Sequence, residues 1–462
     1  MTTTHEARPG SRPATVGMAP GGLPLLGHAI PLRRRPLDFL AALHAHGDLV
    51  EVRLGPRRTY LACHPDLVQQ VLRDARTFDK GGPVFDKVRL LTGNGLATSC
   101  WAEHRRQRRL MQPAFHPERM AGYATVMDQE ISSMLDSWQE GRVFDVNTAM
   151  QALTARIIVR TLFSTRIRDS AVTEIQDCLP VITRGFFTRM VAPLGLMEKL
   201  PTRSNRRFDG ALERMRNLID ETISSHPAGI DHGDLLSSLL VAEDEETGER
   251  LGRHEIHDQV VTLLLGATET TGNALAWIFH LLGENPEAEE QLHREMDGLL
   301  SGRRPDFDDL PHLDYTRRVV TEALRLYPST WLLTRSTTRE TELAGVRLAP
   351  GTVVLLSFYA LGHNPELYSA PERFDPDRWL PERAKTVPRG AWTPFGGGSR
   401  KCIGDRFGTI EVMLVLAAVA ADWRLRPRPG PGIRPEPKAS LSTGPLPMVP
   451  ERRRRGNSAA VE

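Results

Sequence analysis

Cysteine is scarce in this sequence, and the spacing of the few cysteines excludes several classes of protein. The 462 residues contain four cysteines, and no two of them form a CxxC pair. Such spacing fits neither a disulfide-stabilised scaffold nor a structural zinc site, and it indicates a reducing compartment. The four are Cys63, Cys100, Cys178 and Cys402.

Long hydrophobic runs are absent as well. The longest apolar stretch, Val412 to Ala421, is too short to span a bilayer and predicts a buried helix instead. Residues 1–36 lack the apolar centre of a signal peptide. We therefore predict a cytoplasmic protein without a membrane span.

The chain also lacks a large net charge and an obvious linker. A net charge of +2 argues against nucleic acid as the main partner, and 40% hydrophobic residues suffice for a large core. We predict one domain over residues 21–450, between a disordered tail at 1–20 and a basic tail at 451–462, in a monomer. The run from Arg452 to Arg455 is interpreted as solvent-exposed, although nucleic acid or anionic lipid would also attract it.

Apolar residues recur at helical spacing through much of the sequence. Alternating residues around Gly55-Pro56 predict a hairpin over 49–54 and 59–62, and 346–356 predicts a short sheet element. Helix therefore dominates. The segments with helical spacing are 116–139, 146–165, 210–225, 255–284, 287–301 and 315–326.

Cys402 lies in a glycine-rich segment directly before the apolar stretch from Phe407 to Ala420. Backbone N–H groups at the start of a helix stabilise a thiolate, and the thiolate is the form that ligates metals. The glycines allow the backbone to fold tightly around a large flat group, and Arg400 adds a positive charge nearby. The alternative is a buried, inert cysteine.

This segment carries a family resemblance. Phe395, Gly398, Arg400, Cys402 and Gly404 together resemble the haem-binding signature of the cytochrome P-450 family. The resemblance covers roughly residues 20–447 and implies a mainly α, triangular fold with a small β-rich lobe. It also implies haem b as the cofactor, with its iron ligated by Cys402, and a thiolate ligand favours O–O cleavage.

Residues 254–282 predict one long helix with an unusual centre, in which small residues meet an acid and hydroxyls. A threonine hydroxyl can bond to a carbonyl in the preceding turn. The alternative is an ordinary helix contact with Glu269 at the surface. The segment is similar to the distal helix of the family, which implies that Thr270 delivers protons during dioxygen activation and that Glu269 relays them. Ala267 stands where many relatives have glycine.

Glu322 and Arg325 are three residues apart and share one face of a predicted helix. A surface pair of this kind is common and contributes little. The surrounding stretch is apolar, however, and it precedes a proline-rich segment that contains Arg373 and Arg378. The family resemblance implies a structural triad of Glu322, Arg325 and Arg378 that holds the cysteine loop. Arg378 matches the motif better than Arg373.

A dense cationic cluster follows Trp101, and a solvated basic face would explain it. The two propionates of a haem, however, require Arg or His donors. The resemblance therefore assigns Trp101, His104 and Arg108 to the haem edge, and Arg335 and Arg400 complete the set. The remaining basic residues predict a docking surface for an acidic iron–sulfur protein. They are Arg105, Arg109, Lys401 and Arg406.

Substrate-facing positions follow only from analogy with the family, and core packing explains the same side chains nearly as well. Their apolar character suits a small hydrocarbon-like ligand. The stretches 21–28 and 206–208 also resemble bacterial sesquiterpene oxidases such as the pentalenene oxygenases, which implies secondary metabolism, including antibiotic biosynthesis. The positions are Phe85, Phe186, Phe187, Leu263, Gly266, Trp331, Leu332 and Leu333.

The resemblance therefore predicts a haem-thiolate monooxygenase that inserts one atom of O2 into a C–H bond. Electrons would come from a ferredoxin and an NAD(P)H-dependent ferredoxin reductase, because no flavin or iron–sulfur domain fits in the remaining length. Two alternatives stay open, namely a peroxide-driven haem-thiolate peroxygenase and a non-catalytic haem-binding sensor. Turnover with reductant, compared with turnover on peroxide, separates the three.

Overall fold

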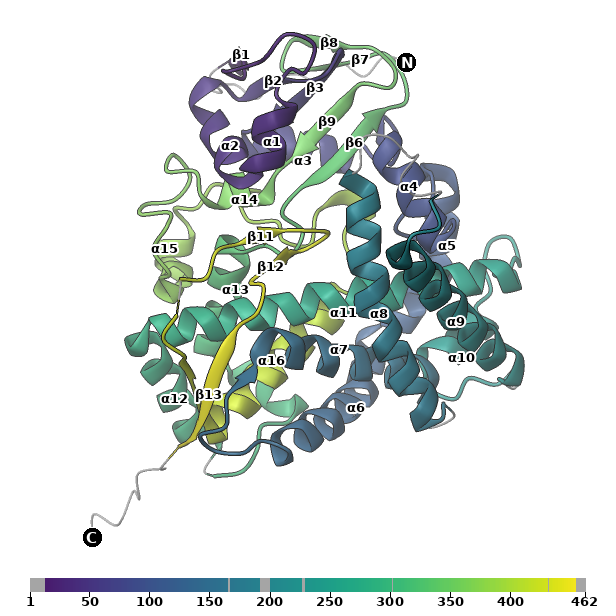
Figure 1. Cartoon of the computed structure of the whole chain (residues 1–462), viewed down its shortest axis with the longest axis vertical. Coiled ribbons are helices and arrows are strands. Elements are labelled where there is room, and N and C mark those ends of the chain that lie inside the picture. The colour runs from purple at the N-terminus through teal and green to yellow at the C-terminus, as the bar shows by residue number, and fades with distance from the viewer. Residues whose placement is uncertain are drawn as a thin grey trace.

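The computed structural model describes residues 13–164, 167–191, 200–226, 229–300, 302–430 and 432–453. It consists of a large helical lobe and a smaller β-rich lobe (Figure 1). The helices are α1 (Ala29–Arg34), α2 (Pro36–Ala42), α3 (Pro65–Arg73), α4 (Pro83–Thr92), α5 (Trp101–Met111), α6 (Pro117–Asp136), α7 (Val146–Phe163), α8 (Asp169–Val191), α9 (Arg203–Ser225), α10 (Leu235–Val241), α11 (Arg253–Glu284), α12 (Pro286–Leu300), α13 (Asp314–Leu326), α14 (Phe358–Gly362), α15 (Pro381–Ala384) and α16 (Asp405–Asp422).

The strands are short, and within the described ranges they form four sheets. The strands are β1 (Val16–Met18), β2 (Leu49–Leu54), β3 (Arg57–Ala62), β4 (Phe78–Asp79), β5 (Phe144–Asp145), β6 (Leu333–Thr337), β7 (Thr341–Leu343), β8 (Val346–Leu348), β9 (Val353–Leu356), β10 (Trp423–Pro427), β11 (Glu436–Pro437), β12 (Leu441–Ser442) and β13 (Pro447–Arg452). The main sheet has the order β1-β2-β3-β9-β6-β4. Its parallel β3–β9 pair aligns Tyr60 with Val354, and this pairing brings the N-terminal hairpin against a segment almost 300 residues later.

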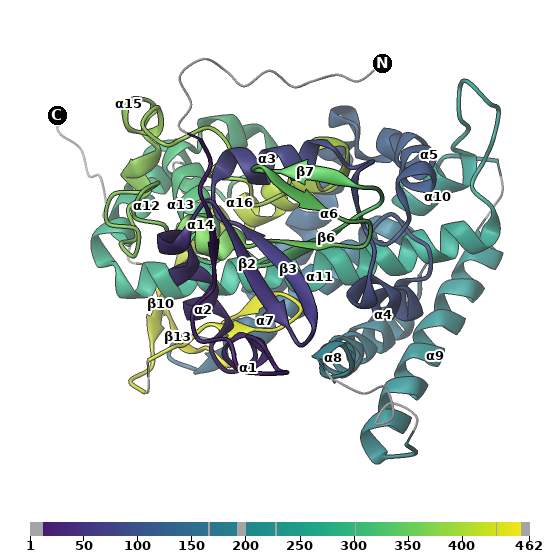
Figure 2. The same cartoon turned by 90° about the horizontal axis from the view of Figure 1, so that it is seen from above.

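The long helix α11 crosses the middle of the helical lobe and organises it (Figures 1 and 2). Glu255 accepts a hydrogen bond from the Gly252 N–H, 2.9 Å away, which caps the first turn. The helix ends before the Asn285-Pro286 step, because proline disfavours helical conformation in the residue that precedes it. Its 32 residues make it about 48 Å long at 1.5 Å per residue. It packs against α7, α13 and α16, and the largest apolar core surrounds it.

The structure confirms the mainly helical prediction and corrects several boundaries. The expected hairpin is β2–β3, and the six segments with helical spacing correspond to α6, α7, α9, α11, α12 and α13. The predicted element at 346–356 is two strands in different sheets, because β8 pairs with β7 while β9 pairs with β3 and β6. Helix α8 was missed.

Both predicted tails include residues that belong to the folded domain. Residues 16–18 form β1, which pairs in parallel with β2, so the prediction of disorder up to residue 20 is wrong there. At the other end, Arg452 lies over the Trp423 ring at 4.5 Å. Arg453 donates to Asp297 at 2.7 Å and to the Ala420 carbonyl at 2.8 Å. These two arginines therefore belong to the fold, while residues 1–12 and 454–462 lie outside the described residues.

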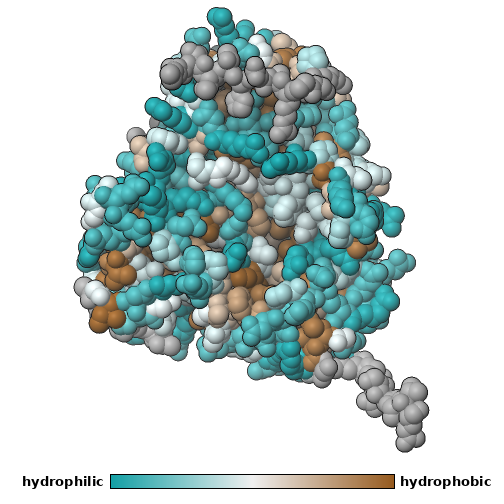
Figure 3. All heavy atoms as spheres, turned by 180° about the vertical axis from the view of Figure 1, so that it is seen from behind, coloured by the Kyte–Doolittle hydropathy of each residue, from teal (hydrophilic) through white to brown (hydrophobic). Residues whose placement is uncertain are grey.

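The rear face of the molecule is mostly hydrophilic (Figure 3). Figure 3 shows that polar side chains cover most of the rear face, with small and separate hydrophobic patches. Within the described part of the chain, no helix combines the length and apolar character that a bilayer crossing requires.

Candidate functional site

The loop that carries Cys402 runs from the short 3-10 helix η7 (Gly398–Arg400) to the start of α16. The Cys402 N–H donates to the Phe395 carbonyl at 2.9 Å, which closes the loop. Gly398 has a φ of +64°, and a Cβ atom there would lie 2.2 Å from the Leu72 carbonyl oxygen of α3. Only glycine satisfies both the left-handed backbone and this close approach.

The sulfur of Cys402 receives a backbone hydrogen bond from Gly404. Cys402 is exposed, but the protein atoms around its sulfur displace water and raise the pKa of this thiol, while the Gly404 N–H and the charges of Arg108 and Lys401 act in the opposite direction. Arg108 also donates to the Lys401 carbonyl, so α5 is fastened to the cysteine loop. The positive charges that act on the sulfur thus come from Arg108 and Lys401, whereas Arg400 points elsewhere.

Arg400 belongs instead to a buried cluster of positive groups between β4, β6 and α5. It donates to the Ser99 carbonyl at 3.0 Å and pairs with Asp79. Arg335 is 3% exposed, and burial together with Arg400 lowers its pKa to about 10. His104 is 2% exposed, and burial together with Arg400 and other cations lowers its pKa to about 3.

Lys80 adds a further cation to this cluster. Its Nζ donates to the Leu96 carbonyl at 3.2 Å, and burial with Arg335 and Arg400 nearby lowers the pKa of its ammonium well below the usual range. Asp79 is the carboxylate that faces both arginines. The cluster therefore holds more buried positive charge than Asp79 alone can neutralise.

This excess of positive charge fits the two propionates of a haem. Among the described residues, the Nε atom of Arg400 is a buried donor without a hydrogen-bond partner. A buried donor of this kind is costly unless an acceptor reaches it. Lys80, His104, Arg335 and Arg400 can donate to two carboxylates, so the donor set matches the group that the sequence implied.

The centre of α11 borders open space on one side. A Cβ atom at Gly266 would meet nothing within 4 Å, so the helix borders open space there. The Thr270 hydroxyl donates to the Gly266 carbonyl at 2.6 Å, as the threonine-rich sequence predicted. A Cβ atom at Gly408 of α16 would lie 3.8 Å from the Thr271 hydroxyl, which shows how closely the helix after Cys402 approaches α11.

Glu269 is half-buried. Its carboxyl group contacts Ser440 of the β11–β12 hairpin, and burial raises its pKa, while the Ser440 hydrogen bond and the Lys438 charge lower it. Ser329, just before β6, donates to the Thr270 carbonyl at 2.7 Å. The polar centre of α11 is thus held by two segments far away in the sequence.

Glu322, Arg325 and Arg378 form one buried ion-pair network. Arg325 binds Glu322 through two hydrogen bonds of 2.8 Å, and both side chains have zero exposure. Arg378 donates to Glu322 at 3.2 Å, and Trp379 donates to it at 2.8 Å. Arg373 contributes only its carbonyl, which accepts from Arg325 at 3.1 Å. The network therefore joins α13 to the segment that precedes the cysteine loop.

The predicted substrate positions lie on helices α4, α8 and α11 and around the start of strand β6. Phe85 lies on α4, Phe186 and Phe187 on α8, and Leu263 and Gly266 on α11. Phe85 is 9% exposed but belongs to none of the apolar cores formed by the described residues. Other predicted positions pack against the cores of the β-rich lobe, and the Trp331 indole donates to the Lys438 carbonyl at 2.9 Å. These are Trp331, Leu332 and Leu333.

Sequence reasoning missed Asp79, Lys80, Ser329 and Ser440. Asp79 accepts the Trp101 N–H at 2.8 Å, so it places α5 as well as Arg400. No motif marks these four residues, because they come from turns and two-residue strands that acquire neighbours only in the folded chain. An acid and a lysine directly after Phe78, at the end of strand β4, were the available signal.

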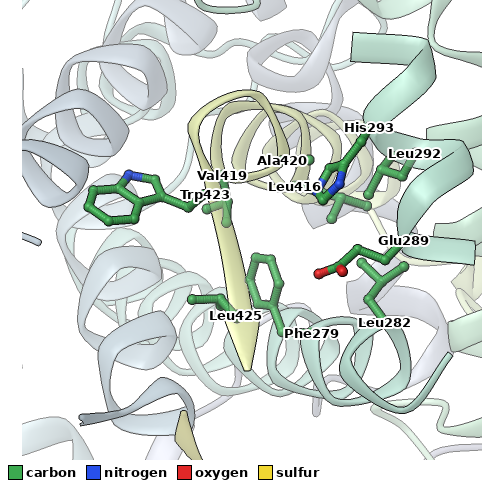
Figure 4. Close-up of a pocket in the computed structure, with 10 residues that line it drawn as sticks. All are labelled: Phe279, Leu282, Glu289, Leu292, His293, Leu416, Val419, Ala420, Trp423 and Leu425. Atoms are coloured by element: carbon green, nitrogen blue, oxygen red, sulfur yellow. The ribbon is translucent and has the colours of Figure 1, made fainter. Parts of the chain in front are cut away.

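Two further features lie away from the buried cations. Figure 4 shows a cavity of about 20 Å³ between α11, α12, α16 and β10, with His293 and Glu289 at its wall. It lies at the end of α16 far from Cys402 and has room for about one water molecule. A shallow surface groove of about 350 Å³ lies beside the cysteine loop, lined by Phe395, Lys401, Asp405, Arg406, Thr409 and Ile410.

Comparisons with known proteins agree with this geometry. Residues 18–450 match the family described as Cytochrome P-450. The chain is 57% identical to "Cyclooctatin synthase" of Streptomyces melanosporofaciens, over 94% of this chain and 95% of that protein. It is 54% identical to "Cyclooctat-9-en-7-ol 5-monooxygenase" of the same organism, over 98% and 99% of the two chains.

More distant similarities follow the same pattern. "Pentalenene oxygenase" of Streptomyces avermitilis is 43% identical, over 92% of this chain and 94% of that protein. The crystal structure of the cytochrome P450DA heme domain superposes with a TM-score of 0.85 at 27% identity, covering 96% of this chain and 99% of that one.

Proposed function

This chain belongs to the cytochrome P-450 family and is a monooxygenase, and from this premise we propose that it hydroxylates a terpene through a haem ligated by Cys402. The family binds haem through a cysteine thiolate. The observation that carries the assignment to Cys402 is its position on a closed loop, beside a buried cationic cluster with an unpartnered arginine donor. We treat residues 21–450, with β1 added, as a single haem domain.

The haem would be held at two places. Cys402 is the iron ligand, since it lies in the signature segment with a backbone N–H directed at its sulfur. His104, Arg335 and Arg400 would bind the propionates, and Lys80 is an additional donor. Trp101 holds the start of α5 in position. Arg108 contributes by fastening α5 to the cysteine loop. Phe395, Gly398 and Gly404 shape that loop.

A haem bound in this way supplies the chemistry that reduces O2 with two electrons and inserts one oxygen atom into a C–H bond. The protein contributes two protons to that reaction, and Thr270 and Glu269 lie where they can hold them. Thr270 keeps its hydroxyl on the Gly266 carbonyl at the border of the open space, and Glu269 is the adjacent acid. Gly266 leaves room beside α11 for small molecules.

The substrate class follows from the apolar wall and the relatives. Two relatives carry the names of oxygenases of cyclooctat-9-en-7-ol and pentalenene, so a terpene hydrocarbon or terpene alcohol is the proposed substrate. Phe85 and Phe187 support this proposal, because both are at least partly buried and neither belongs to a described core. An apolar ligand would gain most of its affinity from burial against such side chains. Phe186 and Leu263 complete the wall, while Trp331, Leu332 and Leu333 border it from the β-rich lobe.

Electrons are proposed to come from an acidic ferredoxin, which a NAD(P)H-dependent reductase keeps reduced. The exposed side chains Arg105, Lys401 and Arg406 surround the cysteine loop and the adjacent groove. Arg109 is a weaker candidate than its sequence position predicted, because it donates to the buried carboxylate of Asp244 at 2.8 Å.

The experiment is reconstitution with NADPH, a [2Fe–2S] ferredoxin and its reductase. Terpene hydrocarbons and their monohydroxylated derivatives are supplied, and products are identified by gas chromatography and mass spectrometry. We expect at least one terpene to give a product that is heavier by one oxygen atom. With 18O-labelled O2, that oxygen atom should carry the label. Products formed on hydrogen peroxide but not with NADPH would instead identify a peroxygenase, and tight haem binding without any product would identify a sensor.

A further inference from the structure

The β11–β12 hairpin holds the carboxyl group of Glu269. Ser440, between the two strands, is 2% exposed and contacts this carboxyl through its hydroxyl. Lys438 of the same hairpin is the charged side chain that acts on Glu269, and it pairs with Glu436 at 2.5 Å. One hairpin therefore contacts Glu269 of α11. The sequence motifs of the site did not include this hairpin.

A buried network fixes the direction of the Ser440 hydrogen bond. The Asn273 amide donates through Nδ2 to the Ser440 hydroxyl at 2.6 Å, while its Oδ1 accepts from Asn147 Nδ2 at 2.9 Å. Asn147 Oδ1 in turn accepts from Gln151 Nε2 at 2.9 Å. Asn147 Nδ2 also donates to the Thr443 hydroxyl at 3.0 Å, and that hydroxyl donates its own proton to the Gly444 carbonyl at 2.8 Å. With Asn147 oriented in this way, a flipped Asn273 would place two amino groups face to face, so the network favours the arrangement described.

In this arrangement, the Ser440 hydroxyl can act toward Glu269 only as a hydrogen-bond donor. A hydroxyl has a single proton, and its oxygen already accepts from Asn273. The proton of Ser440 is thus available to be donated to the Glu269 carboxylate. A donor of this kind favours the ionised acid, which opposes the effect of burial and eases the release of a proton.

The hairpin is also tied to α11 at two positions that follow Glu269 in the helix. The Leu441 N–H donates to the Ser329 carbonyl at 2.9 Å, and the Ser329 hydroxyl donates to the Thr270 carbonyl at 2.7 Å. Further along the helix, the Trp277 indole donates to the Leu441 carbonyl at 3.0 Å. These contacts prevent the hairpin from moving independently of the acid.

We propose that Ser440 is a positioning residue for the proton donor Glu269: its hydroxyl orients the carboxyl and stabilises the carboxylate that remains after proton transfer. The inference rests on the proposed function, in which O2-dependent turnover consumes two electrons from reduced ferredoxin and two protons for each hydroxylated product and water. Hydrogen peroxide brings the same two electrons and two protons with it. Ser440 therefore assists the first reaction and not the second.

The test compares Ser440→Ala with Ser440→Thr and with Ser442→Ala as the matched control. Ser442 lies on the same hairpin, is also buried, and accepts the Gly444 N–H at 3.1 Å, away from Glu269. We expect Ser440→Ala to lower O2-dependent kcat on the order of tenfold at unchanged KM, at the low end for a positioned acid. Peroxide-driven turnover stays at the wild-type rate, Ser440→Thr restores most of the loss, and Ser442→Ala behaves as wild type.

A second readout does not require turnover. The carboxyl infrared band of Glu269, identified by its absence in Glu269→Gln, is titrated in each variant. Loss of one donor should shift its midpoint upward by about one pH unit, which equals a tenfold change in ionisation constant. This shift would support the inference even if no terpene were oxidised, so the two proposals can fail separately. An unshifted midpoint, or equal losses in both reactions, would overturn it.

Discussion

Glu411 is a carboxylic acid in the middle of α16 that is 1% exposed. Its Oε1 atom has no hydrogen-bond partner among the described residues, and burial raises the pKa of this group well above its usual range. Burial therefore favours the neutral form of this group in the folded protein, whereas an unfolded chain ionises it more readily. Burying an ionised carboxylate without a partner would cost far more than protonating it.

We predict that Glu411→Gln stabilises the protein at high pH. Above the unfolded-state pKa, the folded protein binds one more proton at Glu411 than the unfolded chain does, so stability falls as pH rises until the folded-state pKa is reached. Glutamine removes that loss at nearly the same shape. The thermal midpoint of the variant should exceed that of wild type at pH 8 and approach it at pH 4. A midpoint difference that does not depend on pH would contradict this.

At the residue scale, some members of the site could be recognised from the sequence and others could not. Cys402 and the signature around it were recognisable because they are adjacent in the chain. Asp79 and Lys80 were not, because their role depends on Arg335 and Arg400, which lie more than 250 residues away. The direction of Arg400, toward Asp79 and away from the sulfur, likewise requires the folded chain.

At the scale of elements, a buried ion-pair network joins α13 to the segment that precedes the cysteine loop. Arg325 donates to Glu322 and to the carbonyls of Gly362, Pro371 and Arg373. One guanidinium thus binds three backbone carbonyls, at the end of α14 and in the segment 371–373. Such groups require both partners, since a buried charge left alone is strongly destabilising.

We predict that Arg325→Ala lowers the free energy of unfolding by about 3–5 kcal/mol, because it leaves Glu322 buried without its main partner. Soluble yield and haem content should fall together, which absorption spectra and limited proteolysis would record. The control is Arg317→Ala on the same helix, whose side chain is 48% exposed and pairs with Asp314 at 3.3 Å. Full haem content in a soluble Arg325→Ala protein would refute the structural role.

Elements whose apolar residues recur at regular spacing could be predicted from the sequence. Elements in which polar residues or proline interrupt that spacing could not. Helix α11 could be placed to within two residues at each end, because its pattern continues without interruption. Helix α8 was missed because Pro180 lies inside it and polar residues break its period. Strands β8 and β9 were merged, since alternation alone does not reveal which partner strand each one finds.

On the scale of the whole molecule, the face around the cysteine loop combines a surface groove with exposed basic side chains. Arg105 stacks over the Trp101 ring at 4.9 Å and remains exposed, so it is free to meet an acidic protein. Figure 2 places α3 and α5 on the side of the molecule that Figure 3 presents, where hydrophilic side chains dominate.

We predict that Arg105→Glu raises the apparent KM for ferredoxin several-fold at low salt, with kcat on peroxide unchanged. The difference should shrink as ionic strength rises, because exposed charges are screened within about 10 Å at 0.1 M salt. Arg294→Glu, an exposed charge reversal on α12, serves as the control. Equal KM values for Arg105→Glu and wild type would exclude this face as the electrostatic docking surface.

The central claim is that Cys402 ligates a haem iron as a thiolate. It is tested most directly by reducing the purified protein under carbon monoxide and recording its absorption spectrum. Thiolate ligation by Cys402 predicts a Soret band at the wavelength characteristic of that ligand, and the loss of that band in Cys402→His. A wild-type band at the wavelength of histidine-ligated haem, or no bound haem after expression with haem supplied, would contradict it.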